Sequence, residues 1–295
     1  MRADTRYCSG SERSMEALGD EDEISGYLEW LISLSEGCID ANSLDKLVDS
    51  FLYSTLYEEN LAGYGELDEI ILPNKTRLVY PRQLAPSVWA NIVHVYCLDD
   101  YKLKEVAGSV DVYIDAGSFI GVSVLYAATL FPRARLVAIE PNPSAYKILE
   151  YNVRLNNLAE RTRLVHAALS NHTGWAELIV PLNWVNASLR KYSRLSDEEI
   201  WARIRVKSLR IRDVIRSMKG ARTVLKMDVE GAETDLVKNM DGLEEDELPY
   251  ITIVEAHSGR SARIVLRLLR QKGYVCSVDE LDTLSQWIVR CKLNV

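Results

Sequence analysis

The chain has 295 residues and a formal net charge of −8, with 47% hydrophobic and 26% charged residues. This length fits one large domain or a domain with an appendage, and the composition excludes general disorder and a coiled-coil rod. Because the net charge is negative, a DNA partner is not expected, and any contact with RNA would need a locally basic segment.

The five cysteines are scattered along the chain and contain no CxxC pair for zinc or redox chemistry, so we expect reduced thiols. The first residues lack the basic and apolar regions of a signal peptide. The longest apolar stretch, residues 113–131, contains Asp115 and two glycines and does not resemble a membrane helix. These features predict a cytoplasmic protein with no membrane partner.

Residues 1–105 carry 20 acidic and 9 basic side chains. Apolar residues recur at helical spacing over 24–34 and 44–56, which predicts two amphipathic helices. A Pro-Asn-Lys sequence between two apolar runs predicts a short hairpin over 68–80. We interpret residues 1–105 as a mainly helical N-terminal cap that covers the acceptor side and can be removed from a domain formed by 106–295.

From residue 110 onward, short β-rich runs alternate with helical stretches, which predicts a parallel sheet with right-handed crossovers. Two strands in succession at the end of the chain, YVCSVDE and SQWIVRCKL, predict an antiparallel hairpin at the sheet edge. The pattern is interrupted by an insertion near 182–208 with a short helix, SDEEIWAR, capped by Ser196. Residues 190–222 carry 11 basic and 4 acidic side chains, which form either a solvated face or an anion-binding lid.

The segment VYIDAGSFIG contains the clearest signal for a ligand. An apolar strand ends at Asp115, and Gly117 and Gly121 follow, which lets the backbone approach a ligand at a helix N-terminus. The next strand ends at Glu140, a position suited to accept both hydroxyls of a ribose. The chain lacks the G-x-G-x-x-G of dinucleotide folds, and the charge of Asp115 disfavours a pyrophosphate. A cationic nucleoside, S-adenosylmethionine, fits this pattern better than NAD or FAD.

The segments VYIDAGSFIG, AIEPNPSAYKILEYNVRLNN, VHAALSN, VLKMDVEGAE and IVEAH occur in an order that resembles the FkbM-type S-adenosylmethionine-dependent methyltransferases of the class I, Rossmann-like group. The resemblance implies an α/β fold with a doubly wound, mostly parallel seven-stranded sheet. It also implies O-methylation of a hydroxyl on a sugar, glycan or small metabolite. One departure is Ser118-Phe119, where the family commonly has Ala-Asn.

By this resemblance, Asp115 and Gly117 face the methionine moiety, Glu140 the ribose, and the His166-Ala167-Ala168 segment the adenine edge. Asn142 either flanks the ribose or serves as a turn residue before Pro143. The full set of expected cofactor-binding residues is Asp115, Gly117, Ser118, Gly121, Glu140, Asn142, His166, Ala167, Ala168 and Asp228.

The expected catalytic residues are Asp228, Glu230 and His257. Period-two spacing places Asp228 and Glu230 on one side of a strand end, where Asp228 would orient the acceptor hydroxyl. His257 is the candidate base, because an ordinary imidazole titrates near neutral pH. Glu230 could instead serve only in the turn. In a metal-dependent alternative, Asp228, Glu230, Glu255 and His257 would ligate a divalent ion.

Two other functions remain open at the level of the sequence. One is methylation of RNA or protein through the basic 190–222 segment, which steep salt dependence would reveal for RNA. The other is a catalytically silent module that binds S-adenosylmethionine while the cap blocks the crevice.

Overall fold

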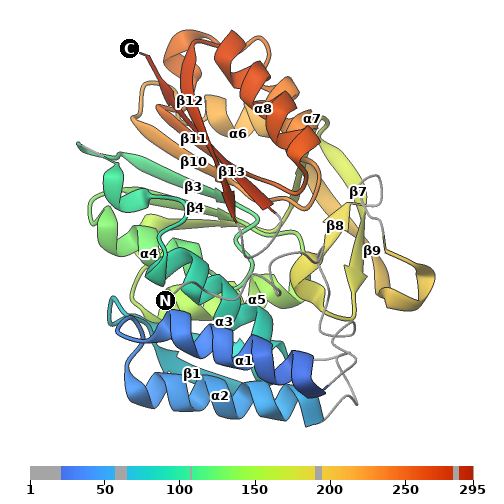
Figure 1. Cartoon of the computed structure of the whole chain (residues 1–295). Coiled ribbons are helices and arrows are strands. Elements are labelled where there is room, and N and C mark those ends of the chain that lie inside the picture. Colours follow the sequence, from blue (N-terminus) through green and yellow to red (C-terminus); the bar gives the residue numbers. More distant parts are fainter. Residues whose placement is uncertain (1–20, 57–64, 107, 190–194, 282–285, 295) are drawn as a thin grey trace.

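The computed structural model describes residues 21–56, 65–106, 108–189, 195–281 and 286–294 (Figure 1). Its central sheet has the strand order β12-β13-β11-β10-β3-β4-β5, and β13 runs antiparallel to both neighbours while the other adjacent pairs are parallel. The strands are β3 (Val112–Ala116), β4 (Arg135–Ile139), β5 (Thr162–Val165), β10 (Thr223–Met227), β11 (Ile251–Ala256), β12 (Tyr274–Leu281) and β13 (Gln286–Leu293). The predicted doubly wound sheet with an antiparallel hairpin at its edge is confirmed.

The strands β3 and β10 lie side by side although more than a hundred residues separate them, and the winding of the chain reverses between them. In open α/β sheets, ligands bind outside the carboxyl ends of the strands at such a switch point. Every residue of both strands is buried, which explains why their sequences are nearly continuous apolar runs.

Helices cover both faces of the sheet, as Figure 1 shows. Helices α4 (Val122–Leu130) and α5 (Pro143–Leu155) contribute to one core, and α6 (Ile211–Arg216), α7 (Glu233–Asn239) and α8 (Gly259–Gln271) contribute to a second. The helix that follows the glycine turn begins at Val122, because Gly121 is its N-cap with a φ of 99°. Helix α8 begins after Ser258, whose hydroxyl accepts a hydrogen bond from the Ser261 N–H at 3.1 Å.

Residues 113–131 fold as β3, the glycine turn and α4, and so do not form one long helix. Among the described residues, none of the helices has both the length and the apolar character needed to cross a membrane.

The N-terminal region has the elements that the sequence predicts. It contains α1 (Glu21–Ser35), α2 (Ala41–Leu56), α3 (Ala85–Ile92) and an antiparallel hairpin of β1 (Leu67–Ile71) and β2 (Arg77–Pro81). Its apolar residues belong to the same core as α4 and α5, and the buried Asn152 of α5 binds the backbone of Val79 through both of its amide atoms. A domain boundary at residue 105 stays a prediction, but one continuous core spans it.

A second, four-stranded sheet adjoins the central one and has the order β6-β9-β7-β8. Its strands are β6 (Ala168–Ser170), β7 (Gly174–Pro181), β8 (Ser188–Leu189) and β9 (Ile200–Arg210). The helix predicted for SDEEIWAR is wrong beyond its first turn. Ser196 forms the expected capping box with Glu199, but only a 3-10 turn, Asp197–Glu199, follows before β9 begins at Ile200. Pairing of β9 along the length of β7 outweighs the local helical signal.

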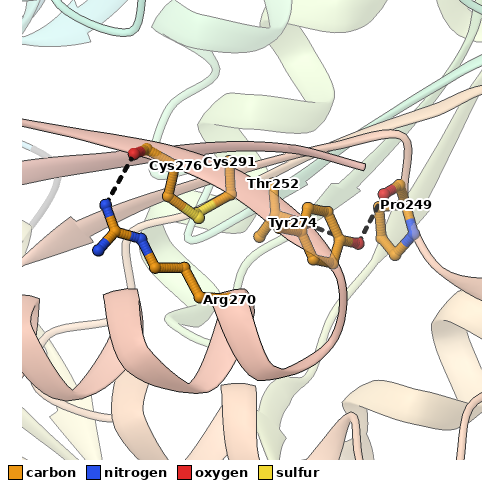
Figure 2. The surroundings of a disulfide bond; sticks show 6 residues. All are labelled: Pro249, Thr252, Arg270, Tyr274, Cys276 and Cys291. Carbon is orange, nitrogen blue, oxygen red and sulfur yellow. Dashed lines mark hydrogen bonds between the residues drawn. A yellow bond between two sulfur atoms is a disulfide. The ribbon is translucent and has the colours of Figure 1, made fainter. Parts of the chain in front are cut away.

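The prediction of reduced thiols is wrong for the four cysteines in the described residues; Cys8 lies outside them. Cys38 is disulfide-bonded to Cys97, and Cys276 to Cys291. Figure 2 shows the second pair, which links β12 to β13 beside Arg270 and Tyr274. The first pair joins residues 59 apart in sequence, so linear spacing gave no sign of it. Disulfides are rare in reducing compartments, so both bonds weigh against the predicted cytoplasmic location.

Candidate active site

The carboxyl ends of β3, β4 and β10 meet around a pocket at the switch point of the sheet. Seven of the predicted site residues line it: Gly117, Ser118, Glu140, Ala167, Ala168, Asp228 and Glu230. Phe119, which was not predicted as a site residue, also lines it. The N-terminal region contributes Asn91, Val95 and Tyr101, and the four-stranded sheet contributes Leu178 and Leu189. The other predicted site residues, Asp115, Gly121, Asn142, His166 and His257, do not line the pocket.

The glycine turn packs against the end of β10. Gly117 has a φ of 81°, and a Cβ atom there would lie 1.7 Å from the carbonyl oxygen of Asp228. Only glycine fits such an approach without a shift of the backbone. The hydroxyl of Ser118 donates to the Asp115 carbonyl at 2.9 Å and accepts from the Ile139 N–H at 3.0 Å, which fixes the turn against β4. The sequence therefore identified the turn correctly.

Glu140 is buried at the end of β4, where two backbone N–H groups hold its carboxylate. Phe119 donates to Oε2 and Asn142 to Oε1, each at 2.8 Å. Burial raises the pKa of Glu140 to about 8, although both hydrogen bonds oppose this rise. The carboxyl group is thus oriented by the backbone at the edge of the pocket, and with this raised pKa it is mainly neutral at pH 7.

Two predicted cofactor residues have structural partners instead. The Asn142 side chain caps α5 by accepting from the Ser144 N–H at 3.0 Å, and it donates to the Trp184 carbonyl at 3.3 Å. His166 stacks on Tyr146 with ring centroids 4.6 Å apart, and its Nε2 lies 3.2 Å from the Pro141 carbonyl oxygen. The contacts of Asn142 therefore support a local structural role, as the cap of α5, over a contact with the ribose.

Lys226 is a central residue that sequence reasoning missed. Its buried ammonium lies 3.2 Å from Asp115 Oδ1 and 3.4 Å from Asp228 Oδ2, and it donates to the Gly117 carbonyl at 3.2 Å. Burial lowers the pKa of Lys226, but Asp115 and Asp228 raise it more, so the side chain is charged. A signal was present, because Lys226 interrupts an apolar strand two residues before Asp228 and so lies on the same side.

His257 is surrounded by carboxylates. Its Nδ1 lies 2.9 Å from Glu233 Oε1, and its Nε2 lies 3.3 Å from Glu230 Oε2 and 3.7 Å from Asp228 Oδ1. Burial lowers the pKa of His257, but Glu230 and Glu233 raise it well above its ordinary value. The imidazole is then protonated at neutral pH, a state that disfavours its predicted role as a base.

Asp228, in contrast, titrates where a base is useful. Burial, followed by repulsion from Glu255, raises the pKa of Asp228 to about 7, although Lys226 opposes the rise. Its Oδ1 is buried and forms no hydrogen bond. Asp228 therefore carries an oxygen without a hydrogen-bond partner beside the pocket and a pKa near neutrality.

The N-terminal region reaches this cluster through Tyr101 and His94, which sequence reasoning also missed. The Tyr101 hydroxyl donates to Glu255 Oε2 at 2.5 Å, and His94 Nε2 lies 3.6 Å from the same oxygen. Burial raises the pKa of Glu255, but its contact with His94 lowers it to about 2. These residues lie about 150 positions apart, so no local pattern could have shown their contact.

A metal ion would use some of the same atoms. Ligand atoms of Asp228, Glu255 and His257 lie within 4.8 Å of one another, whereas Glu230, the fourth residue of the metal hypothesis, is not part of this group. Glu255 also accepts from Tyr101, and an ion bound here would displace the proton of His257, so its binding would depend on pH. In the same cluster, the buried ammonium of Lys226 lies close to Asp228.

Comparison with known proteins agrees with this geometry. The model of the methyltransferase FkbM domain matches residues 115–276. Methyltransferase sdnD of Sordaria araneosa is 28% identical over 196 residues, 57% of this chain and 75% of the relative. Methyltransferase 1 of Beauveria bassiana (strain ARSEF 2860) is 24% identical over 186 residues, 57% of this chain and 74% of that protein.

Among solved structures, a precorrin-6y C5,15-methyltransferase from Geobacter metallireducens matches with a TM-score of 0.40 and 13% identity, covering 65% of this chain and 87% of that one. A putative rRNA-methylase from Clostridium thermocellum matches with a TM-score of 0.43 and 11% identity, covering 66% and 93%. The family match spans more than half of the chain and includes the glycine turn, Glu140, Lys226, Asp228 and His257. The chain is a methyltransferase and belongs to the FkbM methyltransferase family.

Proposed function

We propose that this methyltransferase uses S-adenosylmethionine to O-methylate a hydroxyl on a sugar, glycan or small metabolite. The observation that carries the proposal is the pocket at the switch point, where Glu140 and Asp228 share the lining with neutral side chains. The neutral part of the wall includes Asn91, Val95 and Leu189. Such a wall suits an uncharged acceptor.

The residues of the pocket fit this cofactor. The absence of a side chain at Gly117 leaves the backbone of the turn open to a ligand, and the carboxylate of Glu140 suits a ribose diol. In the cluster around Asp228, carboxylates outnumber basic groups. The other carboxylates are those of Asp115, Glu230, Glu233 and Glu255, and the basic groups are those of Lys226, His94 and His257. This surplus of negative charge favours a ligand with a sulfonium and an ammonium.

In the proposed reaction, Asp228 both orients the acceptor hydroxyl and takes its proton. When bound, S-adenosylmethionine would supply an electrophilic methyl group on its sulfonium for the acceptor oxygen, whose proton Asp228 would accept. Because Lys226 and the imidazolium of His257 lie close to Asp228, they hold its carboxylate in place and stabilise its charged form. Glu230 acts through His257 by keeping it protonated. We thus assign the proton transfer to Asp228 and a positioning role to His257.

The pocket favours a small acceptor over RNA. Two basic side chains of β9 have partners: Arg203 pairs with Asp197, and Arg205 lies over the ring of Trp175. A phosphate near Asp228 and Glu230 would meet like charge. Methylation of RNA or protein is therefore the less favoured function. The alternative of a catalytically silent module that binds S-adenosylmethionine is tested by measuring product formation.

Calorimetric titration with S-adenosylhomocysteine tests the cofactor. We expect Glu140→Ala to remove hydrogen bonds to the ribose worth about 0.5–1.5 kcal/mol each, and so to weaken binding about tenfold. Glu150→Ala is the matched control, because Glu150 lies on α5, pairs with the exposed Arg154 and does not line the pocket. Equal affinity of both variants and the wild type would rule out ribose binding by Glu140.

The acceptor is tested by incubating the protein and S-adenosylmethionine with hydroxylated metabolites, glycans and RNA, and measuring S-adenosylhomocysteine formed. Turnover of a neutral alcohol that is insensitive to salt supports the proposal. Turnover of RNA alone, falling steeply between 50 and 200 mM salt as is general for phosphate contacts, contradicts it. No product with any acceptor, despite cofactor binding, would favour a silent module.

A further inference from the structure

Trp184 anchors the four-stranded sheet beside the cofactor turn. It lies in a 3-10 turn, Trp184–Asn186, between β7 and β8, and its side chain is 2% exposed. Its ring meets the Phe119 ring edge-on, with centroids 6.1 Å apart. Its carbonyl accepts a hydrogen bond from Asn142 at 3.3 Å. Two residues that flank the carboxylate of Glu140 therefore both contact Trp184.

Phe119 is held in an uncommon conformation that brings about this contact. Its φ is 49°, which costs a residue other than glycine about 1–2 kcal/mol. The same residue donates its N–H to Glu140 Oε2 and presents its ring to both the pocket and Trp184. A ligand that binds Glu140 therefore contacts the hydrogen-bond partner of Phe119, and Phe119 also packs against Trp184 beside the second sheet.

The residues that follow Trp184 form part of the pocket wall. Val185, Ala187, Ser188 and Leu189 line the pocket, whereas Trp184 does not. The preceding residue, Asn183, donates to the Ser87 hydroxyl of α3 at 3.0 Å, which ties the turn to the N-terminal region. Residues 184–189, which we call the acceptor wall, are thus attached through Trp184 to residues that flank Glu140 and through Asn183 to α3.

We propose that Phe119 and Trp184 are positioning residues that couple the cofactor site to the acceptor wall, so that cofactor binding orders residues 184–189 and precedes acceptor binding. The inference rests on the proposed function, because it assumes that the cofactor binds at Glu140. Ordering by a first ligand lowers the entropy cost of binding the second. Coupling of this kind generally changes the second affinity about 5- to 150-fold.

Hydrogen–deuterium exchange measured by mass spectrometry tests the coupling without an acceptor. In the wild type, saturating S-adenosylhomocysteine should slow exchange of the peptide covering 184–189 at least about fivefold. Phe119→Leu keeps an apolar side chain but removes the aromatic contact, and should reduce this slowing to less than about twofold. Trp184→Phe tests the other partner and should have a similar effect. Trp175→Phe is the matched control, because Trp175 lies in β7 of the same sheet, is 52% exposed and does not line the pocket.

Calorimetry on each protein separates the possible failures. If S-adenosylhomocysteine does not bind the wild type, the proposed function fails. If it binds but leaves exchange of 184–189 unchanged, the coupling is refuted while the proposed function stands. If Phe119→Leu and Trp184→Phe bind the ligand and still show the full wild-type slowing, Phe119 and Trp184 do not transmit it. If Phe119→Leu loses binding, Trp184→Phe decides the question, since Trp184 does not line the pocket.

Discussion

Replacing Gly117 with alanine tests the close approach on which the whole site depends. The left-handed φ of 81° costs alanine about 1–2 kcal/mol. The new Cβ would lie 1.7 Å from the Asp228 carbonyl oxygen and 2.9 Å from its carbonyl carbon, so the end of β10 must move. Overpacking of this kind adds about 1–3 kcal/mol. We therefore expect the free energy of unfolding to fall by about 2–5 kcal/mol in total.

Gly242→Ala provides the matched control for this experiment. Gly242 has a φ of 79°, almost the same as Gly117, but a Cβ there would meet nothing within 4 Å. Its replacement should cost only the conformational term, about 1–2 kcal/mol. The difference between the two variants isolates the contact with Asp228.

Urea unfolding and titration with S-adenosylhomocysteine together measure both consequences. Because Asp228 moves when Gly117 gains a Cβ, Gly117→Ala should also weaken ligand binding, whereas Gly242→Ala should leave it unchanged. The reasoning is refuted if both variants lose the same stability and bind the ligand as the wild type does. Equal stability loss with selective loss of binding would show that the turn moves and β10 does not.

Four further predictions concern titration, metal use, the disulfide and the N-terminal region. Carbon-13 NMR of the Asp228 carboxyl should show a midpoint near pH 7, since burial and Glu255 raise its pKa to about 7, and a midpoint near 4 would remove Asp228 as the base. Once an acceptor is known, turnover should rise as the pH rises through this range, because deprotonation of Asp228 creates the base. A chelator should leave turnover unchanged. Loss of turnover that added divalent ion restores would support the metal alternative. Cys97→Ser should lower the free energy of unfolding by about 2–4 kcal/mol under oxidising conditions. A reductant should then destabilise the variant less than the wild type, because the variant has lost the bond to Cys38 and keeps Cys276–Cys291; an equal effect of the reductant on both proteins would contradict this. The sequence alone suggested that a chain without the N-terminal cap would stay folded. We instead expect a chain starting at Lys104 to lack a cooperative thermal transition, because its core is shared with the removed residues. A sharp transition with retained ligand binding would contradict this.

Much of the fold was readable from the sequence because its signals are local. Buried parallel strands are continuous apolar runs, so VYIDA and TVLKM were recognisable as strands, and the capping box of Ser196 and Glu199 was recognisable from their spacing. The ligand edge followed from topology, since the carboxyl ends of parallel strands meet at one side of the sheet. Hence the sequence alone was enough to place the glycine turn, Glu140 and Asp228 in one pocket.

Protonation states, pairings and shared cores were decided only by tertiary structure. From the sequence alone, His257 is an ordinary candidate for a base. In the structure, Glu230 and Glu233 come from another strand end and hold its imidazole protonated. The bond between Cys38 and Cys97 and the contact of Tyr101 with Glu255 join residues far apart in the chain. A pKa and a disulfide depend on what surrounds a side chain in space, and linear spacing carries no information about neighbours that the fold brings in from elsewhere.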